Sequence, residues 1–435
     1  MKKKIYILSL LFCVSFLNAY NQAVIEVNPG DDLITAVQDA SAGDTIYVMQ
    51  GLHKAQYQGV VVDKSLVIKG EPGESYPLLY IKQIDVQADD VSFLLTGLEI
   101  SGFEVDSLTG TENQENVVAD YLLNLVSGNT ANAFGDISIT NSHIRNFNKS
   151  IVRGDRDTYT VDNFLFDNIV AHDFRGGSDY GPFRLKSKIT FNAFTLTNST
   201  LYDFLNKIID CQNVVPSPMD VLIENCTFNN MGGGKSGNYL FDIADNDQAT
   251  LVIQSCILGR TNVSDLVTVN GWRVNELATL QMMNTAMTPD FIVTEGTYAA
   301  TTWNKTEYNL ENFDPEWTDP DNGDFSLPLG SDLLQWSPEG TIIGDPRWNP
   351  IGEGIHNLDA NPGFRLFPNP ASGQVTVRME KAGAAIEIYN STGRLVRILS
   401  NTGIENTIDI SGLNQGIYYL RIAGENRIAK KLLVQ

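Results

Sequence analysis

Short apolar stretches, each broken by one asparagine, glycine or serine, recur along most of the chain. In MDVLIENCTFNN (219–230), apolar and polar residues alternate on both sides of Asn225, and a period of two is typical of a half-buried strand. The intervals between successive breaks are 27, 44, 27, 30, 27, 30 and 29 residues, and a polar insertion at 106–120 accounts for the longest. The breaks fall at Gly70, Gly97, Asn141, Asn168, Asn198, Asn225, Ser255 and Asn284.

This repeat predicts an all-β fold, a right-handed parallel β-helix. A unit of this length cannot bury its apolar side alone, so successive units are expected to stack as coils with the usual handedness. Asparagine and glycine tolerate the left-handed backbone that a bend between two strands requires. Because stacked coils lie about 4.8 Å apart, Asn141, Asn168, Asn198 and Asn225 are predicted to form an internal ladder of side-chain hydrogen bonds.

Both ends of the predicted β-helix domain, residues 20–348, differ from the repeat. Leu33, Ile34, Val37 and Ala40 have helical spacing, which predicts an N-terminal capping helix within 31–51. Such a helix would protect the open end of the first coil from pairing with other chains. Residues 305–348 are rich in glycine, proline and aspartate, and we expect an irregular closing segment there, followed by a linker at 349–363.

The first 19 residues, MKKKIYILSLLFCVSFLNA, have three lysines before a short apolar run and end in a small residue. This pattern predicts a cleaved signal peptide, since the run is too short for a transmembrane span. Beyond it lie Cys211, Cys226 and Cys256. Cys226 and Cys256 each follow a break in successive coils, which favours stacked free thiols in the core and leaves a disulfide as the alternative.

Charge is distributed unevenly along the chain. The formal total is −22, residues 1–19 contribute +3, and the nine Lys/Arg and five Asp/Glu of 364–435 contribute +4, so residues 20–363 carry −29. A body this acidic disfavours nucleic acid and anionic membranes as partners. It also disfavours acidic polysaccharides, unless bound cations or a local basic patch intervene. Solubility outside the cell is the simplest interpretation of the charge.

Residues 24–348, with a cap followed by coils of 27–30 residues, resemble the pectate-lyase-like β-helix superfamily. The closing GDPRW (344–348) resembles the ending of poorly characterised β-helix proteins encoded beside polysaccharide-utilisation genes in Bacteroidetes. The resemblance implies a function in polysaccharide binding or processing. One β-helix scaffold carries lyases, hydrolases, epimerases and adhesins, so the fold does not decide among them.

The tail at 364–435 contains FRLFPNPASGQVTV, IEIYNSTGRLV, ISGLNQGIYYLRI and a final KKLLVQ. Its alternating strands and its turns at 390–393 and 414–416 predict a small antiparallel β-sandwich. These motifs are similar to those of the type A C-terminal sorting domain of the type IX secretion system. The resemblance implies secretion to the outer-membrane surface or the medium, with that machinery and its sortase as partners.

One further strand in each coil is where related enzymes place their binding groove. Aligning LLNL, IVRG, RLKS, IIDC, LFDI and LVTV predicts one outward residue per strand. Two cations then stack beside two carboxylates. The outward residues are Asn124, Arg153, Lys186, Asp210, Asp242 and Thr268.

A polysaccharide lyase needs cations beside a uronate carboxylate and a base for the neighbouring proton. On the register of the aligned strands alone, we hypothesise that Lys186 is the base and that Arg153 and Arg184 are substrate clamps, while Asp210 and Asp242 would hold calcium.

Asn124 and Thr268 would contact substrate. Lys186-Ser187 resembles a Lys-Ser pair of the chondroitinase-B-like and alginate-lyase branch, whose Arg-His-Gly segment this chain lacks. The alternatives are an ion ladder without chemistry, worth at most about 1 kcal/mol per exposed pair, and a non-catalytic adhesin or structural surface protein.

Overall fold

A computed structural model describes residues 22–434 with the exception of several stretches. These are 55–58, 106–110, 118, 127–131, 156–158, 175–179, 187–188, 213–216, 234–237, 244–245, 262–268, 276, 290–301, 306–312, 338–340, 351–363, 368–370, 380–384, 391–394, 400–402 and 423–428. The chain divides into two compact units, Met1–Pro350 and Ile351–Gln435. Among the described residues, no helix has the length and apolar character needed to span a membrane.

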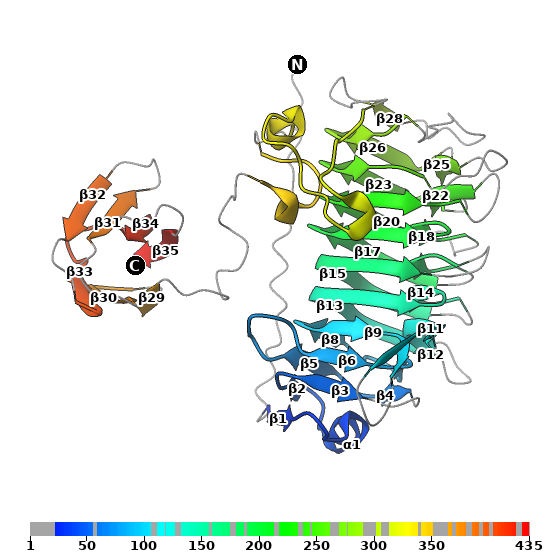
Figure 1. The fold of residues 1–435 in the computed structure, drawn as a ribbon, viewed down its shortest axis with the longest axis horizontal. Coiled ribbons are helices and arrows are strands. Elements are labelled where there is room, and N and C mark those ends of the chain that lie inside the picture. Colours follow the sequence, from blue (N-terminus) through cyan, green and yellow to red (C-terminus); the bar gives the residue numbers. More distant parts are fainter. Residues whose placement is uncertain are drawn as a thin grey trace. The chain divides into compact units, whose positions relative to one another are not determined.

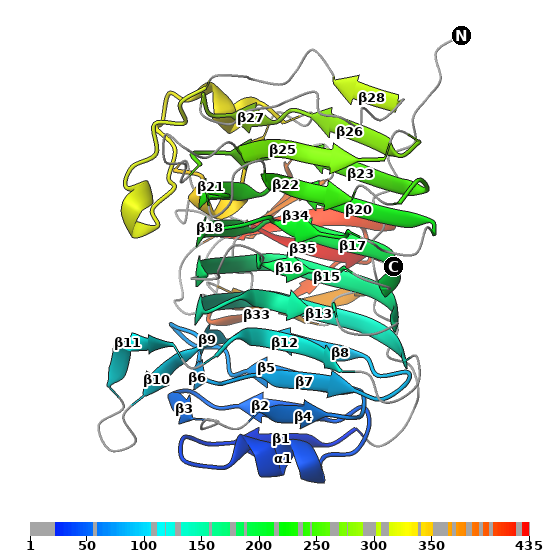
Figure 2. The same ribbon diagram turned by 90° about the vertical axis from the view of Figure 1, so that its right-hand side faces the viewer.

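The first unit is a parallel β-helix, as the repeat predicts (Figures 1 and 2). Strands of successive coils pair in parallel at matching positions on both sides of the breaks. We call the sheet that contains them the first sheet. Its strands are β1 (Val24–Val27), β2 (Thr45–Val48), β3 (Leu52–Lys54), β5 (Leu66–Gly70), β6 (Leu78–Tyr80), β8 (Phe93–Thr96), β9 (Glu99–Ser101), β13 (Asn132–Phe147), β15 (Tyr159–Phe174), β17 (Ile189–Thr197), β18 (Thr200–Phe204), β20 (Met219–Glu224), β21 (Thr227–Met231), β23 (Ala249–Gln254), β24 (Ile257–Leu258), β26 (Thr279–Met283), β27 (Ala286–Met287) and β28 (Thr302–Lys305).

A second sheet closes the coils on their other side, in the order β25-β22-β19-β16-β14-β12-β7-β4. A hairpin of β10 (Phe103–Val105) and β11 (Glu112–Val117) directly precedes one of its strands, β12, in the sequence. The strands of the second sheet are β4 (Val60–Val62), β7 (Ile84–Gln87), β12 (Tyr121–Val126), β14 (Ser150–Arg153), β16 (Phe183–Arg184), β19 (Ile209–Asp210), β22 (Asn238–Ile243) and β25 (Val269–Val274).

Both sheets face one apolar core. Inward residues at one register position of the second sheet are at most 3% exposed, and burying each contributes about 1.5–3 kcal/mol if it is a large side chain. The stack is therefore held by burial of matching apolar positions. These residues are Leu123, Val152, Phe183, Ile209, Phe241 and Trp272.

The breaks are bends with left-handed backbone at all the aligned positions except Gly70. Gly97, Asn141, Asn168, Asn198, Asn225, Ser255 and Asn284 have φ between 49° and 72°. A left-handed residue interrupts the alternation of inward and outward side chains, so a strand can restart at a new angle. The sequence pattern thus predicted which residue forms each of these bends.

The predicted ladder forms only in part, and its predicted place inside the core is wrong. Asn168 Nδ2 donates to Asn141 Oδ1 at 2.8 Å, and Asn225 Nδ2 donates to Asn198 Oδ1 at 3.3 Å. Asn198 Nδ2 instead donates to Asp167 Oδ1 at 2.8 Å. Asn141 is exposed and the other three asparagines are half-buried, because the bend turns this side chain outward and the following residue enters the core.

Helix α1 (Leu33–Asp39) forms where the helical spacing predicts it. Asp32 caps its N-terminus by accepting from the Ile34 N–H at 3.0 Å, and Leu33 and Val37 join the core. The helix lies beside β1 at one end of the stack (Figure 2). That it protects this end from other chains stays a prediction.

The closing segment crosses the outer surface of strands that follow the bends (Figure 1, yellow). It contains three short 3₁₀ helices, η1 (Pro320–Asn322), η2 (Asp332–Gln335) and η3 (Pro346–Trp348). A separate apolar cluster joins it to β18, β24 and β27. The cluster consists of Tyr202, Ile257, Ala286, Trp317, Phe325, Leu327, Leu333, Leu334, Ile342 and Ile343.

The cysteines are buried free thiols, as the stacking interpretation predicts. The Cys226 and Cys256 thiols donate to the carbonyl oxygens of Glu224 and Gln254, at 3.2 and 3.1 Å. Burial raises the pKa of Cys226 well above its ordinary value, and contact with Cys256 raises it further. Both thiols therefore act as small apolar core groups.

The second unit consists of two antiparallel sheets that share one apolar core. The three-stranded sheet contains β29 (Phe364–Phe367), β30 (Gln374–Met379) and β33 (Glu405–Asp409). The four-stranded sheet has the order β32 (Leu395–Leu399), β31 (Ile386–Asn390), β34 (Gly416–Ile422) and β35 (Ala429–Val434). Strands of both sheets contribute to the core, which is the arrangement of a small β-sandwich.

Candidate functional site

A row of polar side chains crosses the outer surface of the second sheet. Its members occupy one register position in successive strands, and each follows a core residue in sequence. Because side chains alternate along a strand, the row faces away from the core. It consists of Asp85, Asn124, Arg153, Arg184, Asp210, Asp242 and Arg273.

The sequence alignment placed Lys186 in this row, and the position belongs to Arg184. β16 ends at Arg184, which pairs with Arg153 on one side and Asp210 on the other. A slip of two residues keeps a side chain on the same surface. Lys186 still contributes to the site, since its Nζ lies 3.9 Å from Asp210 Oδ2.

Thr268, the last residue that the alignment assigned to the row, lies outside the described residues. Arg273 pairs with Asp242 at this position of β25. Asp242 in turn pairs with Asp210, so the two carboxylates belong to neighbouring coils. The alternation in VNGWRV, with Trp272 inward and Arg273 outward, was the signal that could have located this position.

Asp242 is the most enclosed charge of the site, with a side chain that is 0% exposed. Arg273 binds it through two bonds, from Nε to Oδ1 at 2.9 Å and from Nη2 to Oδ2 at 2.7 Å. Lys207 Nζ lies 2.6 Å from Oδ2, and Gln212 Nε2 also donates to that oxygen. Two cations and an amide therefore satisfy this buried carboxylate.

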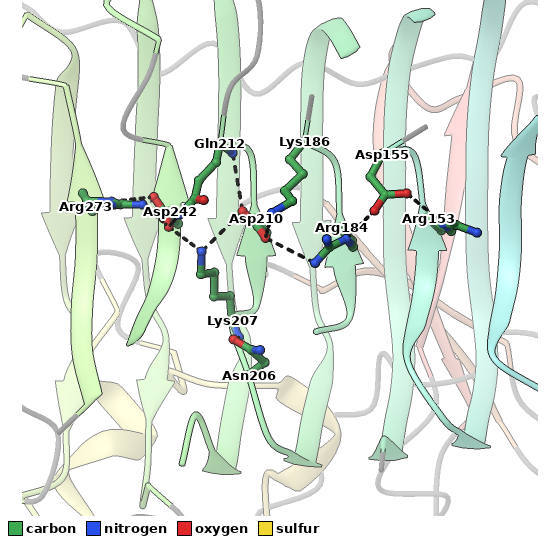
Figure 3. A network of polar contacts seen from close by, with 10 residues as sticks. All are labelled: Arg153, Asp155, Arg184, Lys186, Asn206, Lys207, Asp210, Gln212, Asp242 and Arg273. Atoms are coloured by element: carbon green, nitrogen blue, oxygen red, sulfur yellow. Dashed lines mark hydrogen bonds and ion pairs between the residues drawn. The ribbon is translucent and has the colours of Figure 1, made fainter. Parts of the chain in front are cut away.

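Asp210 has longer contacts with three cations (Figure 3). Its carboxylate oxygens lie 3.4 Å from Lys207 Nζ, 3.8 Å from Arg184 Nη1 and 3.9 Å from Lys186 Nζ. Lys207 thus lies between Asp210 and Asp242 and is shared by both.

Asp155 joins the two arginines in the other half of the site. It accepts from Arg153 Nε at 2.8 Å and from Arg184 Nε at 2.5 Å. Burial acts to raise the pKa of Asp155, but the hydrogen bonds and charges of Arg184 and Arg153 outweigh it and hold the pKa below its usual value. Both guanidinium groups are thereby fixed side by side in adjacent coils.

Each arginine of the row also lies over a tyrosine ring. The guanidinium carbon is 4.7 Å from the ring centre for Arg153 over Tyr121, 4.3 Å for Arg184 over Tyr180 and 4.9 Å for Arg273 over Tyr239. Burial and a hydrogen bond with Tyr180 raise the pKa of Tyr121 to about 12. The Tyr121 phenol therefore stays neutral at physiological pH, and all three rings lie beside the cations.

We define the polar network as the residues of Figure 3: Arg153, Asp155, Arg184, Lys186, Asn206, Lys207, Asp210, Gln212, Asp242 and Arg273. Five of its side chains are cationic and three are carboxylates, which gives a formal charge of +2. The three carboxylates are at most 10% exposed, whereas Lys186 and Arg273 reach 23% and 26%. The network thus presents positive charge on a domain that is otherwise strongly acidic.

The arrangement of Asp210 and Asp242 does not fit the predicted calcium site. Calcium takes six to eight oxygen ligands, but Lys207 lies between these carboxylates and Arg273 occupies both oxygens of Asp242. The described residues contain no group of three or more His, Cys, Asp or Glu suited to a metal ion.

Asn124 has an unused acceptor beside the network. Its Nδ2 donates to Asp85 Oδ1 at 2.7 Å, while its buried Oδ1 has no hydrogen-bond partner among the described residues. An unsatisfied buried acceptor costs about 1–3 kcal/mol, so a donor from a bound molecule or a water would be stabilised there.

Five network members were missed from the sequence. Four of them lie outside the register position of the row, so the period of two could not select them: Asp155, Asn206, Lys207 and Gln212. Arg273 was missed because the alignment used a different segment of the coil.

Residues 365–435 match the family described as the secretion system C-terminal sorting domain. The tail is a sorting domain. It indicates a protein that is secreted or displayed on the outer-membrane surface by the type IX system. Residues 221–348, the last coils and the closing segment, match the family described as Domain of unknown function (DUF5123).

The chain also has distant similarity to solved structures and to one curated protein. Two structures of the PL6 family alginate lyase AlyGC, one of them of a mutant, have 16% and 15% sequence identity and TM-scores of 0.46 and 0.41. They cover 67% and 68% of this chain but only 40% and 39% of the lyase. Beta-agarase A of Zobellia galactanivorans is 36% identical over 72 residues, 16% of this chain and 13% of the agarase. The chain thus spans less than half the length of these proteins.

Proposed function

We propose that this exported protein binds an acidic polysaccharide along the outer surface of the second sheet, which we call the charged face. The supporting observation is the net charge of the polar network, +2 within a region of −29. Clustered cations attract a polyanion locally even when the whole domain repels it. The proposal therefore places the glycan across the strands, along the row of arginines.

The side chains of the row match the groups of an acidic sugar. Arginine pairs with carboxylates through two parallel hydrogen bonds, and Arg153 and Arg184 hold guanidinium groups in adjacent coils, with side chains that are 11% and 9% exposed. The unpartnered Asn124 Oδ1 would accept a bond from a sugar hydroxyl. The half-buried Tyr180, which lies against Arg184, adds aromatic surface, which is the feature expected of a carbohydrate-binding face.

A finer proposal is that the face also cleaves its ligand as a polysaccharide lyase with Lys186 as the base. Lys207 is held at 2.6 Å by Asp242, whereas the ion pair of Lys186 is a long one of 3.9 Å to Asp210. Lys186 is therefore the network lysine with the most freedom to approach a substrate.

In this reaction, arginines neutralise the uronate carboxylate and so acidify the proton at C5. Lys186 accepts that proton in its neutral amine form, the C5–H and C4–O bonds break, and a C4=C5 double bond forms. The leaving oxygen takes up a proton from water. Calcium has no role in this scheme. The rival function, a non-catalytic adhesin, keeps the binding and lacks this step.

The test is to incubate the purified chain with alginate, pectate and chondroitin, with neutral agarose as a comparison. Retardation in affinity gels reports binding, and ultraviolet absorbance of the unsaturated product reports cleavage. We expect retardation by at least one acidic glycan and none by agarose. Lys186→Ala should abolish any absorbance, while Lys69→Ala, an exposed lysine on the first sheet, should change neither signal.

The outcomes separate the two levels of the proposal. Retardation of the protein without ultraviolet absorbance of product supports the adhesin function and excludes the lyase function. Absorbance that Lys186→Ala retains shows that another group is the base. No retardation by any acidic glycan overturns the binding proposal itself.

A further inference from the structure

The four-stranded sheet of the sorting domain ends in an apolar edge strand. Among the described residues, β32 pairs with β31 on one side and with no strand on the other. Leu395, Val396 and Ile398 are 45%, 39% and 53% exposed. Ile386 and Ile388 of the neighbouring β31 are fully buried, so the exposure belongs to β32 itself.

Among the described residues, β32 exposes three large apolar side chains, whereas the edge strands β33 and β35 expose none. Edge strands are usually blunted by charge, proline, bulges or coverage, because their free backbone groups recruit other strands. β33 carries Glu405 and Asp409, and β35 is bridged at Val434 by Ala371. β32 has the sequence LVRIL, with Arg397 as its one charge. The pairing with β31 shifts register at Val396, between Leu395 and Arg397, so the edge has a local irregularity there.

We propose that β32 is the docking strand of the sorting domain and that a strand of the secretion machinery extends the four-stranded sheet at this edge. Backbone hydrogen bonds would supply affinity, and alternate side chains would supply specificity. The chemistry of β32 calls for a partner strand that is apolar and places a carboxylate opposite Arg397.

Charge argues against a second copy as the occupant. An antiparallel pair of two β32 strands centred on their middle residue would set Arg397 against Arg397, and like charges directly opposite are destabilising. The sorting domain is basic as a whole, with +4 over residues 364–435, which likewise favours an acidic partner over a copy of itself.

The chain provides a matched pair of variants for the test. Ile398 and Ile404 are both isoleucines with 53% exposure, but Ile404 lies outside β32. The full-length gene would be expressed in a bacterium that carries the secretion system, with Ile398→Lys, Val396→Lys or Ile404→Lys. The ratio of protein at the surface and in the medium to protein retained in the cell is measured by immunoblot.

We expect Ile398→Lys and Val396→Lys to lower this ratio by about fivefold or more, since each buries a charge in the added sheet, and Ile404→Lys to leave it unchanged. Thermal unfolding of the purified variants checks that each folds. Normal export of folded Ile398→Lys and Val396→Lys overturns the proposal, as does equal loss with Ile404→Lys. A wild-type dimer in light scattering that Ile398→Lys dissociates would also overturn it, in favour of a second copy.

Discussion

Two outer surfaces of the β-helix are formed by the same repeat but carry different outward side chains, charged on one surface and apolar on the other. On the charged face, the network presents arginine and lysine side chains over buried carboxylates. On the surface of β18, β24 and β27, which we call the covered face, the closing segment packs an apolar cluster over the strands. The coil repeat therefore determines the backbone fold, and the outward residues determine whether a surface is covered by another segment or remains exposed.

The covered face is sealed by the GDPRW segment. Asp345 accepts from Thr200 Oγ1 at 2.7 Å and from the Arg347 N–H at 3.0 Å. Arg347 Nη2 reaches the bend residue Asn168 at 2.7 Å, and Trp348 Nε1 donates to Thr200 at 2.7 Å. GDPRW thus ties the end of the domain back to coils far earlier in the sequence, which is a structural role.

The largest expected effect comes from breaking this tie with Asp345→Ala. The side chain of Asp345 is 0% exposed and forms an ion pair with Arg347 at 2.7 Å. Removing one partner of a buried pair costs about 3–5 kcal/mol, so the free energy of unfolding in urea should fall by that amount. Glycan binding by the folded fraction should not change, because the charged face is untouched.

Asp332→Ala is the matched control, since Asp332 is an exposed carboxylate in the same closing segment. Its effect should stay within about 0.5 kcal/mol. A similar small loss in Asp345→Ala would mean that GDPRW does not stabilise the covered face.

A second difference between the faces is their response to acid. On the covered side, burial and the neighbouring His172 and Arg145 lower the pKa of His143 to about 3. The unfolded chain binds this proton near pH 6.5 and the folded chain does not, so stability is full above pH 6.5 and falls as the pH drops. The loss approaches about 1.4 kcal/mol per pH unit below that point.

His143→Gln should flatten this part of the pH profile, measured by urea unfolding between pH 7 and 4. Asp155→Asn tests the charged face in the same experiment. The pKa of Asp155 is lowered, so its contribution is present above about pH 3.9 and is lost only as the pH falls further. The Asp155→Asn protein should therefore show the same slope of unfolding free energy against pH as the wild type above pH 4. An unchanged slope in His143→Gln would exclude this histidine as the source.

The sequence predicted those parts of the molecule that repeat. The bends at Asn141, Asn168, Asn198 and Asn225 were located because each coil must place a left-handed residue at the same point. The buried thiols of the next residue followed from the same register. The sorting domain was recognisable from its motifs.

The residues of the candidate site were predicted less well because the strands that carry them are short and unevenly spaced along the sequence. β16 and β19 contain two residues each, too few to show a period, and the loops between them vary in length. Lys186 was therefore displaced by two positions. Lys207 and Asp155 enter the site through side-chain contacts across coils, which no local pattern records.

The smallest predicted effect concerns Asp242 and separates stability from binding. In Asp242→Asn, Arg273 and Lys207 lose a charged acceptor, which should cost about 2–3 kcal/mol in urea unfolding. The same change raises the formal charge of the network from +2 to +3, so affinity for an acidic glycan at low salt should increase severalfold.

Asp220→Asn, the same charge change on an exposed residue of the first sheet, controls for total charge and should alter affinity much less. Opposite signs for stability and affinity are expected only if the carboxylate serves to hold the cations. A folded Asp242→Asn protein that binds more weakly would instead mean that Asp242 itself contacts the sugar.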